Sequence, residues 1–290
     1  MLKSTGESSM SLAFLPVSSL SKQSLRCVFV CALSLGLCAP VSAQTPPSER
    51  TGLQPESSAS EWGIGIGAIS QQLGIKDIDR NTNVFPFISY ENRYIRWFGP
   101  NLDVKLPSLQ INNAQRIAFT LSVGYDFSGY DDDDIKDTPV LQGMDERDGG
   151  FVIGARAQWQ TPVVNVSAKW TGDISGDRDG STFSLGLDKR WMLGQQVMLS
   201  PRIVATWLDE SYVDYQYGVR ANEATSERQA YSGDSTINIE LGLRTAYLFN
   251  RQSSIFIDAS IISLGDEIKD SPLVDSSTEN RVMFAYLYKF

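Results

Sequence analysis

The last eleven residues of the chain are the feature that most restricts its fold. Apolar or aromatic side chains occupy every second position of this segment: Val282, Phe284, Tyr286, Tyr288 and Phe290. Residues two apart lie on one face of a β-strand, so the segment predicts a strand with an aromatic face that continues to the last residue. Chain ends of soluble domains are usually polar and frayed. A transmembrane barrel explains this end better, because its last strand pairs with its first and its outer face meets lipid.

The aromatic end also predicts how such a barrel is assembled. A last strand that ends in Phe resembles the signal read by the outer-membrane barrel-assembly machinery. We therefore predict that Phe284, Tyr286, Tyr288 and Phe290 form an assembly signal. Outer-membrane lipid and the assembly machinery are then the expected partners. An edge strand of a soluble β-sandwich is the alternative interpretation of this one segment.

The first 43 residues have the organisation of a secretory signal peptide. Two basic residues precede a short apolar run over residues 27–37, and small residues lead to a predicted cleavage site after Ala43. The apolar run is too short to cross a bilayer as a helix. All 3 cysteines lie in this segment, so the exported chain is expected to contain no disulfide. Met1 and Met10 are both candidate start residues.

Composition limits the classes of partner. The 290 residues include 25 Lys and Arg against 34 Asp and Glu, which gives a net charge of −9. Removal of the signal peptide, which carries Lys3, Lys22, Arg26 and Glu7, changes this charge to −11. Nucleic acid is therefore not an expected partner, because phosphates require a basic surface. No apolar run of about eighteen residues follows the signal peptide, so helical membrane spans are excluded.

Two segments follow the signal peptide. Residues 44–60 contain prolines among Ser and Glu and are predicted to be a flexible periplasmic linker. Residues 61–290 are predicted to form one barrel domain. At its start, Gly63, Gly65 and Gly67 alternate with apolar residues, which predicts a strand whose glycine face lies against a crowded interior. The glycines do not form a nucleotide-binding loop, because no helix or βαβ unit follows them.

Alternating apolar and polar residues predict an all-β fold, a transmembrane antiparallel β-barrel of about twelve strands. Bacterial single-chain barrels require such an even number. The expected strands cover residues 62–68, 82–90, 93–98, 101–106, 116–127, 151–159, 164–170, 183–191, 195–208, 237–249, 255–261 and 280–290. Long and short connections alternate from residue 128 onwards, and the long ones are expected outside the cell. The earlier strands are less regular, so ten strands is the alternative.

The residue types exclude several kinds of catalytic site. The chain has no histidine, and the exported part has no cysteine. Ser-His-Asp catalysis, Cys-His catalysis and the usual zinc sites are therefore impossible. The run Asp131–Asp134 lacks the ligand spacing of a calcium-binding loop and is interpreted as a solvated loop tip. We predict no catalytic residue, no metal and no cofactor, and hence a protein that is not an enzyme.

Charged residues recur on the strand faces opposite the apolar ones. Six of them are expected to face the lumen: Arg116, Arg156, Arg202, Glu240, Arg244 and Asp258. Such charges can form the selectivity filter of a channel. They can also pair with one another and fill a narrow barrel, since about eight strands give a filled barrel and about sixteen leave a pore. Both interpretations stay open for twelve strands.

A tyrosine-rich segment after residue 208 resembles a known family. The family motif comprises Tyr215, Tyr217, Gly218, Val219, Glu223 and Tyr231. Together with Pro86–Glu91 and the strand that ends in Phe, this segment resembles the MipA/OmpV family of outer-membrane proteins. The resemblance extends over residues 61–290 and implies an outer-membrane barrel.

The resemblance implies several possible functions. Some members of the family are described as scaffolds that join a murein hydrolase to a murein synthase, and others as porin-like or adhesive. We therefore expect a structural or scaffolding protein for murein-modifying enzymes, with a porin-like diffusion channel for small solutes or a surface adhesin as alternatives. The tyrosine motif is a candidate binding loop, and the alternative is that its rings only pack the loop. Periplasmic enzymes would have to meet residues 44–60 or the short turns, whereas the motif lies outside or in the lumen.

Overall fold

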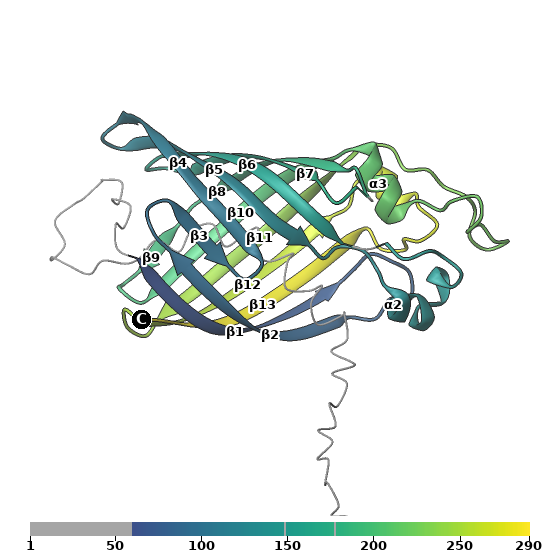
Figure 1. Ribbon diagram of the computed structural model, residues 1–290, viewed down its shortest axis with the longest axis horizontal. Helices are drawn as coiled ribbons and strands as arrows, with labels where there is room; N and C mark the ends of the chain where they lie inside the picture. The colour runs from purple at the N-terminus through teal and green to yellow at the C-terminus, as the bar shows by residue number, and fades with distance from the viewer. Residues whose placement is uncertain (1–59, 148, 177) are drawn as a thin grey trace, which may run out of the picture.

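The chain forms one antiparallel sheet that closes into a barrel (Figure 1). The computed structural model describes residues 60–147, 149–176 and 178–290. Closure comes from the first strand, β1 (Glu61–Gln72), which pairs along nearly its whole length with the last strand, β13 (Thr278–Lys289). The predicted signal peptide and residues 44–59 of the predicted linker lie outside the described residues.

The wall contains twelve strand positions, as the sequence predicts. Between β1 and β13 the strands are β2 (Asn81–Glu91), β3 (Ile95–Phe98), β4 (Asn101–Asn112), β5 (Gln115–Asp126), β6 (Gly150–Gln160), β7 (Asn165–Asp173), β8 (Ser181–Asp188), β9 (Trp191–Leu193), β10 (Val197–Leu208), β11 (Thr236–Leu248) and β12 (Ser253–Ser263). Both β8 and the short β9 pair with β10, so together they occupy one position with a break at Lys189 and Arg190. The alternative of ten strands is therefore wrong.

Short turns lie at one end of the barrel and long loops at the other (Figure 1). The short turns cover residues 92–94, 113–114, 161–164, 194–196 and 249–252, at the end where the chain stops. The long loops lie between β1 and β2, between β5 and β6, between β7 and β8, between β10 and β11, and between β12 and β13. Bacterial barrels have short periplasmic turns and longer extracellular loops. The C-terminus is therefore periplasmic, and the long loops face the outside of the cell.

Several short helices interrupt the long loops. They are α2 (Asp132–Asp137), the 3₁₀ turn η2 (Pro139–Leu141), α3 (Glu210–Tyr217) and α4 (Asp266–Lys269). Among the described residues, no helix has the length and apolar character needed to cross a bilayer.

The outer face of the barrel carries two belts of exposed aromatic side chains. The belt near the long loops contains Phe151, Trp170, Phe183 and Trp207, and the belt near the short turns contains Trp62, Trp97, Trp159, Trp191, Tyr288 and Phe290. Exposed Ile, Leu and Val side chains lie between the belts. Aromatic rings prefer the two membrane interfaces, and aliphatic side chains prefer the hydrocarbon between them. The outer face is therefore built to contact lipid.

The glycine face of β1 lies against aromatic rings, as the sequence predicts. A Cβ atom added at Gly65 would lie 2.2 Å from the ring of Phe87, and one added at Gly67 would lie 2.9 Å from the ring of Phe85. These two rings belong to a buried hydrophobic cluster that also contains Phe256. Only glycine leaves room for the rings, so β1 and β2 fill this side of the lumen together.

The strand between β2 and β4 is β3, which has only 4 residues. It pairs with the last part of β2, from Ser89 to Glu91, and then turns back at Gly99, which has a φ of +52°. The Gly99 N–H donates to the carbonyl of Ile88, so the main-chain groups of Ile88 point towards β3. Pro86 lies two residues earlier in β2, so its main-chain groups point to the same side. No described strand pairs there, which explains how a proline fits within a strand.

Candidate functional site: the extracellular cap and the lumen

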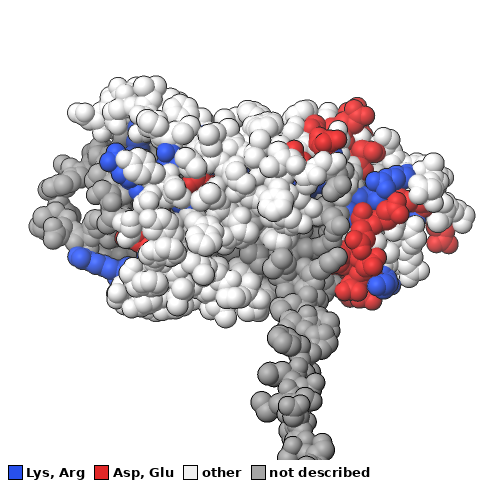
Figure 2. All heavy atoms as spheres, viewed as in Figure 1, with Lys and Arg blue, Asp and Glu red and all other residues white. Residues whose placement is uncertain are grey.

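Four long loops fold together over the extracellular end of the barrel. We call residues 73–80, 127–147, 209–235 and 264–277 the cap. Two buried hydrophobic clusters join the loops: one contains Ile75, Tyr130, Leu141, Met144, Val219 and Leu273, and the other contains Leu208, Val213, Leu264 and Ile268. Figure 2 shows that acidic side chains gather at this end of the molecule. The loops therefore have a packed core of their own and an acidic outer surface.

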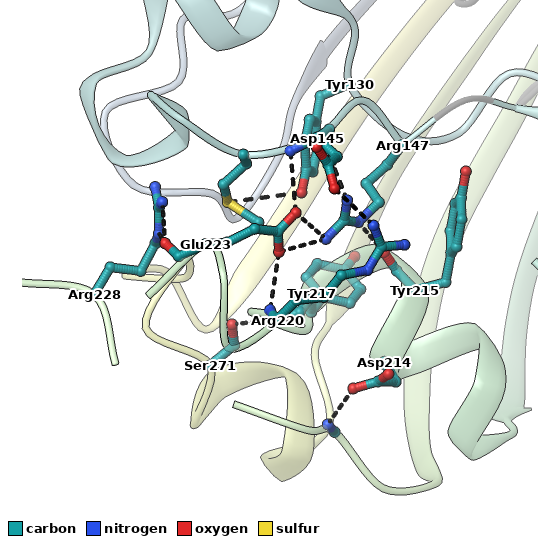
Figure 3. Close-up of polar contacts among 12 residues, drawn as sticks. Tyr130, Asp145, Arg147, Asp214, Tyr215, Tyr217, Arg220, Glu223, Arg228 and Ser271 are labelled. Atoms are coloured by element: carbon teal, nitrogen blue, oxygen red, sulfur yellow. Dashed lines mark hydrogen bonds and ion pairs between the residues drawn. The ribbon is translucent and has the colours of Figure 1, made fainter. Parts of the chain in front are cut away.

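A buried ion pair lies at the centre of the cap (Figure 3). The Nη2 atom of Arg147 donates to both carboxylate oxygens of Glu223, at 2.9 and 2.8 Å, and each side chain is only 1% exposed. The Nε atom of Arg147 donates to the carbonyl of Tyr215 at 2.9 Å. Glu223 also accepts the backbone N–H groups of Asp145 at 3.0 Å and Arg220 at 2.9 Å. These bonds connect the loop after β5 to the loop after β10.

The surroundings of this ion pair set its charge state. Burial alone would raise the pKa of the Glu223 carboxyl, but the hydrogen bonds from Arg147 and from two backbone N–H groups hold that pKa below its ordinary value. Burial raises the pKa of the neighbouring Tyr130 to about 12, despite the positive charge of Arg147. At neutral pH, Glu223 is therefore ionised and Tyr130 is not.

The other motif residues join the same loops. Val219 and Tyr231 exchange two backbone hydrogen bonds, at 2.8 and 3.0 Å. The hydroxyl of Tyr231 donates to the carbonyl of Glu267 in α4 at 2.6 Å, and the carbonyl of Tyr217 accepts the hydroxyl of Ser271 at 2.6 Å. Gly218 ends α3, where a Cβ would lie 2.3 Å from a backbone oxygen. The structure thus brings all six predicted motif residues into the cap and gives them packing contacts.

The acidic run is a solvated loop tip only in part, because Asp132 and Asp133 are exposed as expected but Asp131 is buried. Asp131 is 4% exposed and caps α2, where its carboxylate accepts the N–H groups of Asp133 and Asp134 at 3.0 Å each. The carboxylate of Asp134 accepts the N–H of Asp131 in return, at 3.2 Å. Carboxylates are favourable at a helix start because free N–H groups and the helix dipole meet there. The Asp-x-x-Asp spacing before apolar Ile135 was the available signal.

Four of the predicted lumen charges form one ion-pair network. Arg202 donates two hydrogen bonds to Asp258, at 2.8 and 3.0 Å, and one to Glu240, at 2.7 Å. Arg244 donates to Asp258 at 2.7 Å. Gly242, opposite Arg202 on β11, leaves space for its guanidinium, since a Cβ there would lie 2.4 Å from the Cζ atom. This side of the lumen is therefore filled by paired charges.

The other two predicted lumen charges lie apart from this network. Arg156, in the middle of β6, lines two of the lumen cavities described below. Arg116 lies at the periplasmic start of β5, and its Nε atom donates to Gln160 at 2.7 Å.

Four neighbouring cavities follow the lumen. A cavity of about 80 Å³ at the periplasmic end shares Arg156 and Lys169 with a central cavity of about 320 Å³. The central cavity shares Asn238, Ile262 and Arg281 with a cavity of about 200 Å³ under the cap. A fourth, of about 220 Å³, adjoins the third near α2. The barrel is therefore neither fully packed nor crossed by a wide pore.

The predicted assembly residues lie along β13. Phe284, Tyr288 and Phe290 are exposed on its outer face, and Phe290 is 66% exposed. The Tyr286 hydroxyl donates to Ser253 at 3.2 Å, and the Phe290 N–H donates to the carbonyl of Trp62 at 2.9 Å. The aromatic outer face of this strand is present as expected, and its role in assembly stays a prediction.

Two arginines at the extracellular end were missed by the sequence reasoning. One is Arg147, whose partner Glu223 is 76 residues away. The other is Arg178, which donates to Asp126 and Asp173 at 2.9 Å each and ties the loop after β7 to the neighbouring strand ends. Neither arginine belongs to a strand pattern or a local motif, so no short-range signal could have identified it.

The chain is similar to known outer-membrane proteins. A family model described as "MltA-interacting protein MipA" matches residues 63–290. The MltA-interacting protein of Escherichia coli K12 is 25% identical over 233 residues, which cover 79% of this chain and 89% of that protein. The outer membrane protein OmpV of Vibrio cholerae is 24% identical over 235 residues, 79% of this chain and 87% of that one. A solved outer membrane channel from Pseudomonas putida F1 has a TM-score of 0.41 and 11% identity, and covers 85% of this chain and 100% of that chain.

Proposed function

Since this chain belongs to the MltA-interacting protein MipA family and is an outer-membrane β-barrel, we propose that it is a scaffold for murein-modifying enzymes in the periplasm. The Escherichia coli relative is named as an MltA-interacting protein, and the proposed class of partner follows from that name. A scaffold of this kind needs a contact surface on the periplasmic side. It does not need an open pore.

The observation that carries the proposal is the hairpin between β4 and β5. Only Asn101–Val104 of β4 pair with β3, and the rest of the strand continues with β5 past the neighbouring periplasmic turns. Figure 1 shows this hairpin projecting at the upper left. Leu109 and Ile111 near its end are 57% and 49% exposed. Exposed apolar side chains mark contact sites for a protein or a membrane, and these two lie on the projecting part of the hairpin.

A pull-down from solubilised envelopes tests the scaffold. Immobilised barrel should retain a lytic transglycosylase, identified by immunoblot. The double variant Leu109→Ser, Ile111→Ser should retain at least five-fold less enzyme. The matched control is Val163→Ser, because Val163 is a 76% exposed apolar residue in another periplasmic turn. Deletion of residues 44–60 tests the linker in the same assay.

Two results would count against the scaffold. The first is a wild-type barrel that retains no transglycosylase. The second is retention that is equal for the hairpin variant, the linker deletion and the wild type. Either result would show that the periplasmic surface does not hold these enzymes.

The second candidate function is a narrow channel for small solutes. The specific observation in its favour is the row of neighbouring cavities from the periplasmic end to the cap. Proteoliposomes that contain the barrel should then swell in isotonic solutions of small sugars. Swelling no faster than that of protein-free liposomes would remove this candidate.

A further inference from the structure

We propose that the lumen contains a binding site for a small anionic sugar, a sugar acid or a sugar phosphate, built around Arg156 and Lys169 and reached from the periplasmic end. This site goes beyond the scaffold and does not depend on it. The two side chains line both the central cavity and the periplasmic cavity, so they lie where a ligand would pass from one to the other.

The first argument is the position of two like charges. Arg156 on β6 and Lys169 on β7 are direct partners in the strand register, and both side chains face the lumen. Like charges opposite one another on neighbouring strands destabilise a sheet. Their repulsion is stronger in a barrel surrounded by lipid, where the effective dielectric constant is low. An anion bound between the two cations would convert this unfavourable pair into an attractive site.

The second argument is that the nearby carboxylates already have other partners. Asp103 and Asp126 attract the Lys169 ammonium at longer range. Asp103 accepts two hydrogen bonds from Arg96, at 3.0 and 2.6 Å, and Asp126 accepts one from Arg178 at 2.9 Å. Within the described part of the chain, no carboxylate lies within ion-pair distance of Lys169. An external anion is therefore the group that fits this ammonium.

The third argument is the charge of the central cavity. Six cationic side chains line it: Arg156, Lys169, Arg190, Arg202, Arg244 and Arg281. Two carboxylates, those of Asp188 and Glu240, line the same space, and a third, Asp258, pairs with Arg202 and Arg244. The cations therefore outnumber the carboxylates by six to three. The chain as a whole has a net charge of −9, so the cationic lining contrasts with the rest of the molecule. A cavity of this charge attracts anions and repels cations.

The fourth argument identifies the rest of the ligand. Hydroxyl and amide side chains also line the central cavity: Gln158, Ser167, Ser184, Ser200, Thr206 and Asn238. Such groups both donate and accept hydrogen bonds, as sugar hydroxyls do. The volume of about 320 Å³ is at the lower end of the usual range for small-molecule sites. A single sugar ring with one anionic group matches this lining and size.

Titration calorimetry on the purified full barrel in detergent tests the site. The ligands are glucuronate, glucose 6-phosphate and, as the neutral control, glucose. We expect saturable binding of at least one anionic sugar and at least ten-fold weaker binding of glucose. Lys169→Met should weaken anionic sugar binding at least ten-fold, and Lys169→Glu should abolish it. Stronger binding of glucuronate would assign the site to sugar acids, and stronger binding of glucose 6-phosphate would assign it to sugar phosphates. Either preference supports the proposed site.

The variants are matched to separate binding from folding. Arg116→Met removes an inward-facing cation that lines neither cavity, so binding should stay within two-fold of the wild type. Lys169→Met relieves a repulsion, so the variant should fold normally. Its unheated form should then migrate differently from its boiled form on a denaturing gel, as the folded wild-type barrel does. The proposal is overturned by barrel that binds neither anionic sugar, by equal binding of glucose, or by binding that Lys169→Met leaves unchanged.

Discussion

Loss of one partner from the Arg147–Glu223 pair leaves the other charge buried without compensation. Breaking such a pair typically costs about 3–5 kcal/mol. We therefore expect Glu223→Ala to loosen the cap strongly while the lipid-embedded wall stays intact. The measurement is limited proteolysis of the folded barrel, in which cleavage within residues 209–235 should become at least ten-fold faster.

A second ion pair of the cap supplies the control for this variant. Arg220 pairs with Asp145 at 2.9 Å, but the two side chains are 52% and 60% exposed. Exposed pairs of this kind contribute only about 0–1 kcal/mol. Asp145→Ala should therefore leave the cleavage rate nearly unchanged. Equal rates for Asp145→Ala and Glu223→Ala would show that the buried pair does not hold the cap.

The Glu223 carboxyl makes the cap sensitive to acid. The pKa of Glu223 in the folded cap is held below the ordinary value of 4.5. Its stabilising contribution is fully present above pH 4.5 and is lost as the pH falls through the lowered folded-state pKa. Residues 44–290 contain no cysteine, so a fluorophore attached to Ser226→Cys in a protein that begins at residue 44 reports on the cap alone. Its emission should stay constant from pH 7 to about pH 5 and change below about pH 4.

A neutral variant separates this titration from general acid effects. Glu223→Gln carries no titrating group at the position, so the fluorescence change below about pH 4 should be much smaller. An identical acid transition in the labelled wild type and in labelled Glu223→Gln would assign the transition to another group.

At the scale of single elements, β1 depends on its glycine face. A Cβ at Gly65 would lie 2.2 Å from the Phe87 ring and 2.5 Å from the carbonyl of Tyr286 on the other neighbouring strand. Overpacking typically costs about 1–3 kcal/mol. Gly65→Ala should therefore lower the urea concentration at which half of the protein loses the gel migration of the folded, unheated barrel. Ile64→Ala, on the lipid side, should lower that concentration less. The reverse order would contradict the crowded interior.

The last strand makes a prediction about assembly. Full burial of a Phe side chain contributes only about 2 kcal/mol, and Phe290 is 66% exposed. Deletion of Phe290 should therefore strongly reduce the outer-membrane level in cells, while protein refolded in detergent keeps its heat-modifiable form. Lys289→Ala should change the level little. A normal level without Phe290 would show that the terminal strand is not the assembly signal.

Elements of the wall were easier to predict from sequence than those of the cap. In β5, β6 and β11, apolar residues that face lipid alternate with polar residues that face the lumen. The pattern predicts the strands directly, because a strand has only two faces. The four-residue β3 and the break between β8 and β9 follow from how neighbouring strands meet, so alternation alone could not predict them. In the cap, α3 and α4 are stabilised by contacts between distant loops, such as the bond between Tyr231 and Glu267. Such contacts leave no periodic signal.

Across the whole molecule, the two ends of the barrel differ in charge and packing. The extracellular end carries a packed, acidic cap, and the lumen beneath it has a cationic central cavity. The periplasmic end carries short turns and the projecting hairpin of β4 and β5. This asymmetry supports a barrel that is closed towards the outside of the cell and presents its contact surface and its anion site to the periplasm.

Single-channel recording in planar bilayers tests this closed barrel most directly. At neutral pH, the wild-type protein should insert without stepwise conductance, because the cap covers the extracellular mouth and the lumen holds only small cavities. Glu223→Ala, which we expect to loosen the cap, should show conductance steps under the same conditions, and Asp145→Ala should not. Stable conductance steps from wild-type barrel, of the same size as those from Glu223→Ala, would contradict a closed scaffold.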